Sequence, residues 1–206
     1  DCDDGNPCTT DSCDAATGCE NIAVQYCGLV SCTSHADCGY DDYCHPVTAL
    51  CTPIPADEIH HCWDQLGVCP QDVGDLTTVS STIPLTDTTH YIDGIRVKVK
   101  MIHTASGQLT ITLSNGAETV TLHQLTGGTA DDVFKVYEIA DATHTPGDLD
   151  DLLNYHPDGA WTLQVSDTAS GDVGSIEYWT LYLDVEVLKD DGDPCTNEDE
   201  CAADYC

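Results

Sequence analysis

Cysteine constrains this chain more than any other residue, because its fourteen copies are confined to the two ends. Eleven lie before position 70, three lie after position 194, and the long stretch between has none. Segments this rich in cysteine and too short to bury a core are usually stapled by disulfides in an oxidising, extracellular setting. We therefore expect a secreted or cell-surface protein with cysteine-rich segments over residues 1–71 and 189–206 and one larger domain over residues 72–188.

Zinc binding is the alternative use of so many cysteines. Successive cysteines are separated by four to ten residues, and the two-residue spacing common in zinc ribbons and fingers does not occur. We therefore favour disulfides for all of them. The predicted disulfide cysteines are Cys2, Cys8, Cys13, Cys19, Cys27, Cys32, Cys38, Cys44, Cys51, Cys62, Cys69, Cys195, Cys201 and Cys206.

The net charge of the chain limits the classes of partner that it can be expected to bind. The formal net charge is −32, and all five basic residues lie between positions 96 and 189. Such a chain is repelled by phosphate backbones and by anionic lipid, so neither nucleic acid nor a membrane surface is an expected partner. No apolar run of about 18 residues is present, so membrane insertion is not expected either. The carboxylates favour calcium, although a solvated acidic surface explains the same composition.

Alternating apolar and polar residues run through the central part of the chain and predict an antiparallel β-sandwich. In Ile95–Met101 every second residue is apolar, and the positions between are Arg96, Lys98 and Lys100. This pattern predicts a strand with one buried face and one basic face.

Further strands are predicted on both sides of a strong turn signal. Leu109–Ser114 alternates, Asn115-Gly116 predicts a tight turn, and the alternation then resumes, which together indicate a hairpin. Later alternating runs place Trp161 and Trp179 on buried faces. Residues 148–155 have leucines at helical spacing and predict one or two helical turns.

Two of these stretches are similar to a known family. Tyr91–Leu122 and Gly159–Leu183 resemble the P domain, also called Homo B, of proprotein convertases. The resemblance extends over roughly residues 72–188. It implies a calcium-assisted jelly roll of the kind found after subtilisin-like protease domains and in bacterial surface proteins. The fold class is therefore all-β, a P-domain-like jelly-roll sandwich flanked by disulfide-rich, mostly irregular segments.

The same resemblance implies metal-binding residues. Asp167 and Asp172 match the acidic positions of its second motif, and Asp93 matches that of the first. The alternative is that such aspartates only cap turns. The chain departs from the family at Gln108, where the family commonly has Asp, and at Asn115, where it has Pro.

The two ends resemble each other. Residues 1–24 are similar to the CTDC repeat of slime-mould extracellular-matrix proteins and bacterial surface proteins, and the sequence DDGNPCT at Asp3–Thr9 recurs as DDGDPCT at Asp190–Thr196. Eleven and three are both odd numbers, so pairing within each end leaves cysteines over. Either one end folds back to bridge the other, or the remaining cysteines join molecules head to tail, which would build a fibre.

No catalytic pattern is present, since the chain has neither a Gly-x-Ser-x-Gly elbow nor His-Glu-x-x-His. We therefore expect a protein that is not an enzyme. The leading hypothesis is an extracellular structural or adhesive protein that self-associates, or repeats along a longer chain, through its cysteine-rich ends. The alternative is a non-catalytic C-terminal accessory region of a secreted subtilisin-like protease. A third hypothesis is carbohydrate binding by exposed aromatic residues such as Tyr178 and Tyr182.

Overall fold

The computed structural model describes residues 9–14, 18–23, 30–33, 37–38, 41–44, 48–64, 68–141 and 147–187. It divides the chain into two compact units between Ile54 and Pro55. Among the described residues, no helix is long and apolar enough to cross a membrane. The predicted C-terminal segment, with its three cysteines, lies outside the described residues.

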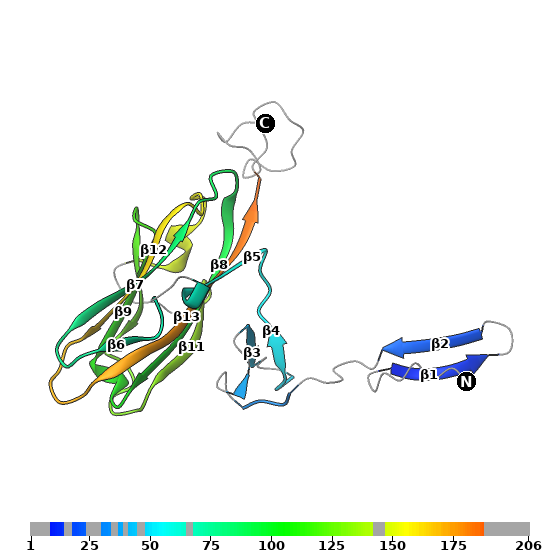
Figure 1. The fold of residues 1–206 in the computed structure, drawn as a ribbon, viewed down its shortest axis with the longest axis horizontal. Helices are drawn as coiled ribbons and strands as arrows, with labels where there is room; N and C mark the ends of the chain where they lie inside the picture. Colours follow the sequence, from blue (N-terminus) through cyan, green and yellow to red (C-terminus); the bar gives the residue numbers. More distant parts are fainter. Residues whose placement is uncertain are drawn as a thin grey trace. The chain divides into compact units, whose positions relative to one another are not determined.

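The second unit consists of two antiparallel sheets (Figure 1). One sheet has the strand order β10-β9-β12-β7, with β7 at Thr78–Leu85, β9 at Leu109–Ser114, β10 at Thr119–Gln124 and β12 at Gly159–Asp167. The other has the order β11-β8-β13-β5, with β5 at Glu58–His61, β8 at Tyr91–His103, β11 at Val133–Glu138 and β13 at Gly174–Glu186. The short β6, Gln71–Val73, also pairs with β13. The predicted all-β sandwich is confirmed.

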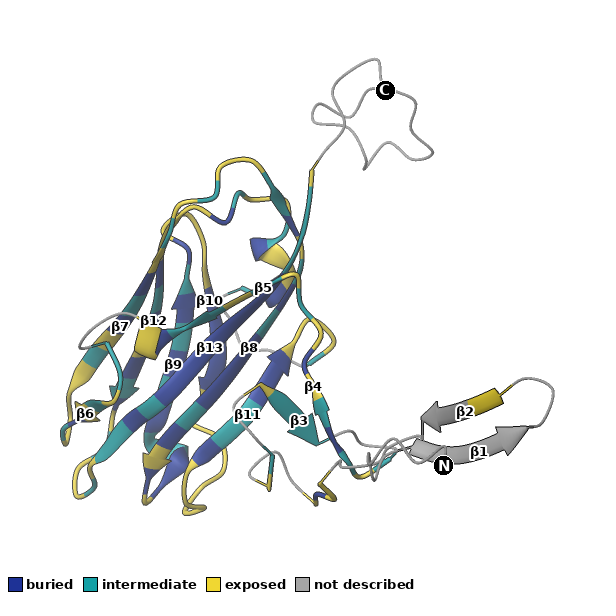
Figure 2. Ribbon diagram, turned by 45° about the vertical axis from the view of Figure 1, so that its right-hand side comes forward, coloured by how far each residue is buried: buried dark blue, intermediate teal, exposed yellow. Residues whose placement is uncertain are grey.

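The core lies between these sheets, where the alternating apolar residues meet (Figure 2). Trp161 and Trp179 are both fully buried, as predicted. Each indole N–H also has a hydrogen-bond acceptor, because the Nε1 of Trp161 donates to the carbonyl of Pro157 and that of Trp179 to the hydroxyl of Ser81. Burial of aromatic rings with their polar atoms satisfied is the most stabilising use of these residues.

The predicted hairpin is confirmed, and its turn explains one departure from the P-domain family. Strands β9 and β10 pair antiparallel across residues 115–118. The side-chain oxygen of Asn115 accepts hydrogen bonds from the backbone amides of Ala117 and Glu118, and Gly116 has φ +96°. An Asx turn followed by a glycine thus replaces the proline of the family.

The predicted helical turn is a 3-10 helix of four residues, Leu149–Leu152. Two further 3-10 turns, Cys62–Asp64 and Ser106–Gln108, join strands of the sandwich.

The boundary of the sandwich lies earlier in the chain than residue 72. Residues 55–71, which the sequence assigned to the cysteine-rich segment, belong to the second unit. Strand β5 pairs with β13, and the disulfide between Cys62 and Cys69 lies next to it, with Cys62 fully buried in the core. Four residues of β5 are too few to show a periodicity, so the sequence did not reveal this edge strand.

Two expectations about the outer face of the five-stranded sheet are wrong. Lys98 is fully buried rather than exposed, and its ammonium nitrogen lies 5.4 Å from the ring centroid of Phe134. Tyr178 and Tyr182 are also buried rather than exposed, with Tyr178 in edge contact with Phe134 and Trp63. Large aromatic side chains on neighbouring strands cover each other and the lysine between them.

The first unit contains two hairpins. Strands β1, Thr9–Asp14, and β2, Gly18–Ala23, pair antiparallel, as do β3, Asp42–Cys44, and β4, Cys51–Pro53. The sequence predicted mostly irregular structure here, since neither pair carries an alternating apolar pattern.

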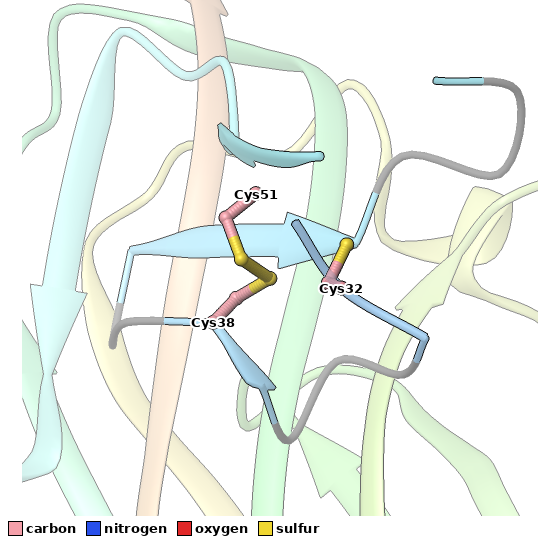
Figure 3. A group of neighbouring side chains, drawn as sticks. All are labelled: Cys32, Cys38 and Cys51. Atoms are coloured by element: carbon pink, nitrogen blue, oxygen red, sulfur yellow. A yellow bond between two sulfur atoms is a disulfide. The ribbon is translucent and has the colours of Figure 1, made fainter. Parts of the chain in front are cut away.

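The second hairpin is stapled by two disulfides, Cys32–Cys44 and Cys38–Cys51, with S–S distances of 2.08 and 2.09 Å. Figure 3 shows the Cys38–Cys51 bond beside the sulfur of Cys32. These three sulfurs are close enough together to resemble a metal cluster, but both bonds are formed. Cys19 is disulfide-bonded as well. Among the described residues, no cysteine is free, which supports disulfides over zinc for this part of the chain.

Candidate functional site

The most unusual polar contact of the sandwich is at one end of its core, where His103 meets Asp167. His103 follows Ile95, Val97, Val99 and Met101 on the core-facing side of β8, and Asp167 follows Trp161, Leu163 and Val165 on the core-facing side of β12. The two strands belong to different sheets. The apolar alternation of each strand therefore ends in a polar residue aimed into the core.

The geometry of this pair leaves buried polar atoms without hydrogen bonds. The Nε2 of His103 lies 3.6 Å from the Oδ2 of Asp167, and both side chains have no exposed surface. Neither atom has a hydrogen-bond partner. An unsatisfied buried polar group costs about 1–3 kcal/mol. Such a cost is commonly tolerated where a site serves a function.

Neighbouring segments fix the position of the imidazole. The Nδ1 of His103 lies 3.0 Å from the carbonyl oxygen of Ala105. The backbone amide of His103 donates a hydrogen bond to the carboxylate of Asp132. Opposite His103 in the ladder is Gly174. A Cβ added at Gly174 would lie against the carbonyl oxygen of Ile102 and 2.8 Å from Cδ2 of His103, so the strands can approach this closely only with glycine there.

Asp172 lies beside this pair, in the β12–β13 loop. Its carboxylate accepts hydrogen bonds from the hydroxyl of Thr104 and from Nε2 of Gln108, the latter at 2.9 Å. These bonds stabilise the ionised form, so the Thr104 hydroxyl and the Gln108 amide hold the pKa of Asp172 below its usual range. The other side-chain atom of Gln108, Oε1, is buried without a partner.

The structure brings together two of the three predicted metal residues. Asp167 and Asp172 lie at the end of the sandwich where β12 passes into β13. Asp93 is exposed near the other end of β8, ten residues before His103. At about 3.3 Å per residue, that separation is about 33 Å. Asp93 therefore belongs to no common site with the other two, and a metal role for it stays a prediction.

The possible metal ligands at the end of the sandwich with Asp167 and Asp172 are oxygens of the types that calcium binds, namely carboxylates and an amide carbonyl. Asp167 Oδ2 and Gln108 Oε1 are two buried oxygens without hydrogen-bond partners, and Asp172 supplies the ionised carboxylate. Among the described residues, only two groups bring three or more His, Cys, Asp or Glu ligand atoms within 4.8 Å of one another, and neither includes Asp167 or Asp172. A cation here would therefore draw on the amide oxygen as well as the carboxylates.

The sequence did not identify His103 as part of a site. The available signal was its position, since a polar residue that continues an unbroken apolar alternation must project into the core. Both ring nitrogens face protein groups, Nδ1 facing Ala105 and Nε2 facing Asp167. The imidazole has no exposed surface, so the geometry fits a binding or structural role better than acid–base catalysis.

Comparison with known families agrees with the motifs. Residues 92–183 match the proprotein convertase P-domain, and residues 1–24 match a Dictyostelium (slime mold) repeat. Both resemblances inferred from the sequence are thereby confirmed. The first match contains His103, Asp167 and Asp172.

Two curated relatives are calcium-dependent proteases of cyanobacteria. The protein from Trichormus variabilis is 39% identical over 99 residues, which are 46% of this chain and 14% of that protein. The protein from Nostoc sp. is 36% identical over 115 residues, 54% of this chain and 17% of that protein. The chain thus spans less than a fifth of the length of these relatives.

Among solved structures, this chain is similar to a serine protease of Aeromonas sobria. The identity is 13% and the TM-score is 0.42, over 85% of this chain and 36% of that chain. The curated relatives favour the hypothesis of a protease accessory region over that of a fibre subunit. Self-association through the cysteine-rich ends stays a prediction, because the C-terminal cysteines lie outside the described residues.

Proposed function

We propose that this chain is a non-catalytic, extracellular accessory region of a longer secreted protease, built on a P-domain sandwich that calcium stabilises. The observation that carries the proposal is the 39% identity to a calcium-dependent protease of which the matched part is only 14%. A match so restricted, in a chain whose residues 92–183 match the P-domain, supports an accessory domain over a catalytic one. The disulfides of the described part support an oxidising, extracellular setting.

The non-catalytic part of the proposal is tested on the chain itself. We expect no cleavage of casein and no labelling by a fluorophosphonate probe, because the chain has no nucleophile elbow. A subtilisin treated in parallel is the positive control. Stoichiometric labelling of the chain would refute a non-catalytic role.

The accessory part is tested by reading the gene on both sides of the coding region for this chain. A protease catalytic domain in the same reading frame is the expected result. Tandem copies of this unit without a protease would contradict the proposal and support a structural repeat instead.

Calcium would be held at the end of the sandwich by Asp167, Asp172 and the side-chain oxygen of Gln108. The ion would supply the positive charge that these buried and ionised oxygens lack. It would also tie the β12–β13 loop to the 3-10 turn that carries Gln108. Fixing this loop to the ends of β8 and β12 is the stabilisation that the proposal assigns to calcium.

Thermal unfolding with excess calcium or with a chelator tests this site. A ligand that binds only the folded state raises Tm by mass action, so we expect a higher Tm with calcium for the wild-type chain. Asp167→Asn and Asp172→Asn should reduce the calcium-dependent shift. The exposed Asp150→Asn is the matched control and should retain it. An equal shift in all four proteins would place the calcium elsewhere.

A further inference from the structure

A second cluster of metal-ligating side chains lies at the edge of the sandwich, outside the residues that match the P-domain. Ligand atoms of Glu58, Asp87 and His90 all lie within 4.8 Å of one another. A fourth side chain, His60, is adjacent, with its Nε2 2.8 Å from Oε2 of Glu58. Two carboxylates and one imidazole from separate segments of the chain are thus gathered in one place, and a second imidazole contacts one of the carboxylates.

The register of β5 explains why Glu58 and His60 face the same way. Glu58 lies opposite Leu183 of β13, and His60 lies opposite Leu181. Directly opposed residues of an antiparallel pair project from the same face, and both leucines are fully buried in the core. Glu58 and His60 therefore project from the core-facing side of an edge strand, where apolar residues are the usual occupants.

The other two residues come from the connection between β7 and β8. Strand β7 is the edge strand of one sheet and β5 is the edge strand of the other. The connection that follows β7 brings Asp87 and His90 against Glu58. The cluster therefore lies where the space between the two sheets would otherwise open to solvent, and its side chains are only partly exposed.

Asp87 is held in position before any ligand binds. Its Oδ1 accepts hydrogen bonds from the backbone amide and the hydroxyl of Thr89, each at 2.8 Å, while its Oδ2 faces Nδ1 of His90 at 2.6 Å. One carboxylate oxygen is thus fixed by Thr89, and the other is directed into the cluster.

The backbone of this connection is also anchored. The amide of Asp158 donates to the carbonyl of Asp87 at 2.9 Å, and Nδ1 of His156 donates to the carbonyl of His90 at 2.7 Å. A ligand set on an anchored loop and a paired strand loses little conformational entropy on binding, which favours a specific site over loose ion association.

We infer that Glu58, Asp87 and His90, with His60 as a fourth ligand, form a site for a divalent transition metal such as zinc. Mixed imidazole and carboxylate ligands suit zinc and its neighbours, whereas calcium takes oxygen ligands alone. Ligands about 2.0–2.2 Å from zinc lie about 3.4 Å apart in a tetrahedron, so atoms already within 4.8 Å need only small side-chain movements. The ion would close the edge of the sandwich by joining β5 to the β7–β8 connection.

This site is distinct from the proposed calcium site. His90 immediately precedes β8, whereas His103 is its last residue. Twelve residue steps along β8 at about 3.3 Å each separate the first and last residues of the strand by about 40 Å. Calcium and zinc binding can therefore be measured independently on one molecule.

Calorimetric titration of the full chain, with disulfides intact and calcium in excess, tests the inference with zinc alone as the probe. We expect one strong site in the wild-type chain. Glu58→Gln and His90→Gln should each weaken it by about 10-fold or more, whereas the exposed Glu138→Gln should bind as wild type does. His60→Gln decides whether the fourth ligand takes part. Circular dichroism of each variant confirms that it folds.

Cobalt(II) provides a second readout, because a four-coordinate ion absorbs visible light far more intensely, and at longer wavelength, than the octahedral hydrated ion. The wild-type chain and Glu138→Gln should develop this absorption, and His90→Gln should not. Equal zinc affinities in Glu58→Gln, His90→Gln and Glu138→Gln, or no strong site in the wild-type chain, would overturn the inference. The polar residues on β5 would then serve only to prevent edge-to-edge pairing of strands.

Discussion

Strands β3 and β4 of the first unit have three residues each, whereas β8 and β13 of the sandwich have thirteen each. Each short strand contains one cysteine of a disulfide, Cys44 bonded to Cys32 and Cys51 bonded to Cys38. The long strands form part of one wall of a buried apolar cluster, which includes Cys62 of the Cys62–Cys69 disulfide. The same chain therefore uses covalent links where it has little apolar surface to bury, and apolar burial where it has enough.

This difference separates the roles of the two units. A sandwich that is stable by burial can hold unsatisfied polar atoms at its end, because the core offsets the cost of the buried His103 and Asp167 atoms. The disulfide-stapled unit has no comparable core in its described part. The candidate sites accordingly lie in the sandwich.

Truncation of a core tryptophan should affect the sandwich alone. Trp161 is fully buried between the sheets, and removal of such a side chain costs about 3–5 kcal/mol. We expect Trp161→Ala to lower the free energy of unfolding of the sandwich by that amount, measured by urea denaturation followed by circular dichroism. Amide exchange in the β3–β4 hairpin should not change. Loss of protection in both units would show that they fold as one.

Removal of one disulfide should destabilise the first unit and leave the sandwich unchanged. The Cys32–Cys44 bond spans 12 residues, and a link that closes a loop of this size stabilises by about 3 kcal/mol. The double variant Cys32→Ser/Cys44→Ser should therefore lose amide protection in strands β3 and β4, and the strands of the sandwich should keep theirs. Hydrogen exchange with mass spectrometry measures both. Retained protection in the hairpin would contradict the claim that disulfides stabilise it.

A substitution in the β9–β10 turn tests a smaller, local contribution to the free energy of unfolding of the sandwich. The side chain of Asn115 accepts two backbone hydrogen bonds, each with a net value of about 1 kcal/mol. We expect Asn115→Ala to lower the free energy of unfolding by about 1–2 kcal/mol in the same urea assay. Asn115→Asp keeps a side-chain oxygen that can accept the same two bonds and is the control. An effect no larger than that of the control would show that Gly116 alone makes the turn.

The smallest expected effect is on acid stability at the end of the sandwich. The pKa of Asp172 is lower in the folded chain than in the unfolded chain, where it is about 3.9. Its contribution is therefore present above that value and is lost as the pH falls through the folded pKa. Between pH 5 and about 3, Tm should fall more steeply for wild type than for Asp172→Asn. Parallel curves would mean that its hydrogen bonds to Thr104 and Gln108 do not favour the ionised form.

The sequence predicted those parts of the fold that have a long periodic pattern. The strands around Val97, Leu113 and Leu163 alternate without interruption, and the structure has them as predicted. Strand β5 was missed because four residues carry no period, and the burial of Lys98 was missed because its aromatic cover comes from other strands. Contacts between distant segments are the part that local patterns do not contain.

The candidate sites also differ in whether a local sequence pattern or a contact between distant segments forms them. Asp167 and Asp172 were found from a family motif, whereas their neighbour His103 depends on two sheets meeting at one end. The cluster at Glu58 combines residues 29 positions apart, Glu58 and Asp87, and neither segment has metal-ligand spacing of its own. Only the pairing of β5 with β13 and the path of the β7–β8 connection bring them together.

Hydrogen exchange of the full chain in calcium and in chelator tests whether the sandwich is a calcium-stabilised domain. We expect calcium to slow exchange in residues 104–108 and 168–173, which surround Asp167 and Gln108, and to leave strands β3 and β4 of the disulfide-stapled hairpin unchanged. Identical exchange in both conditions, or protection confined to the hairpin, would contradict calcium stabilisation of the sandwich.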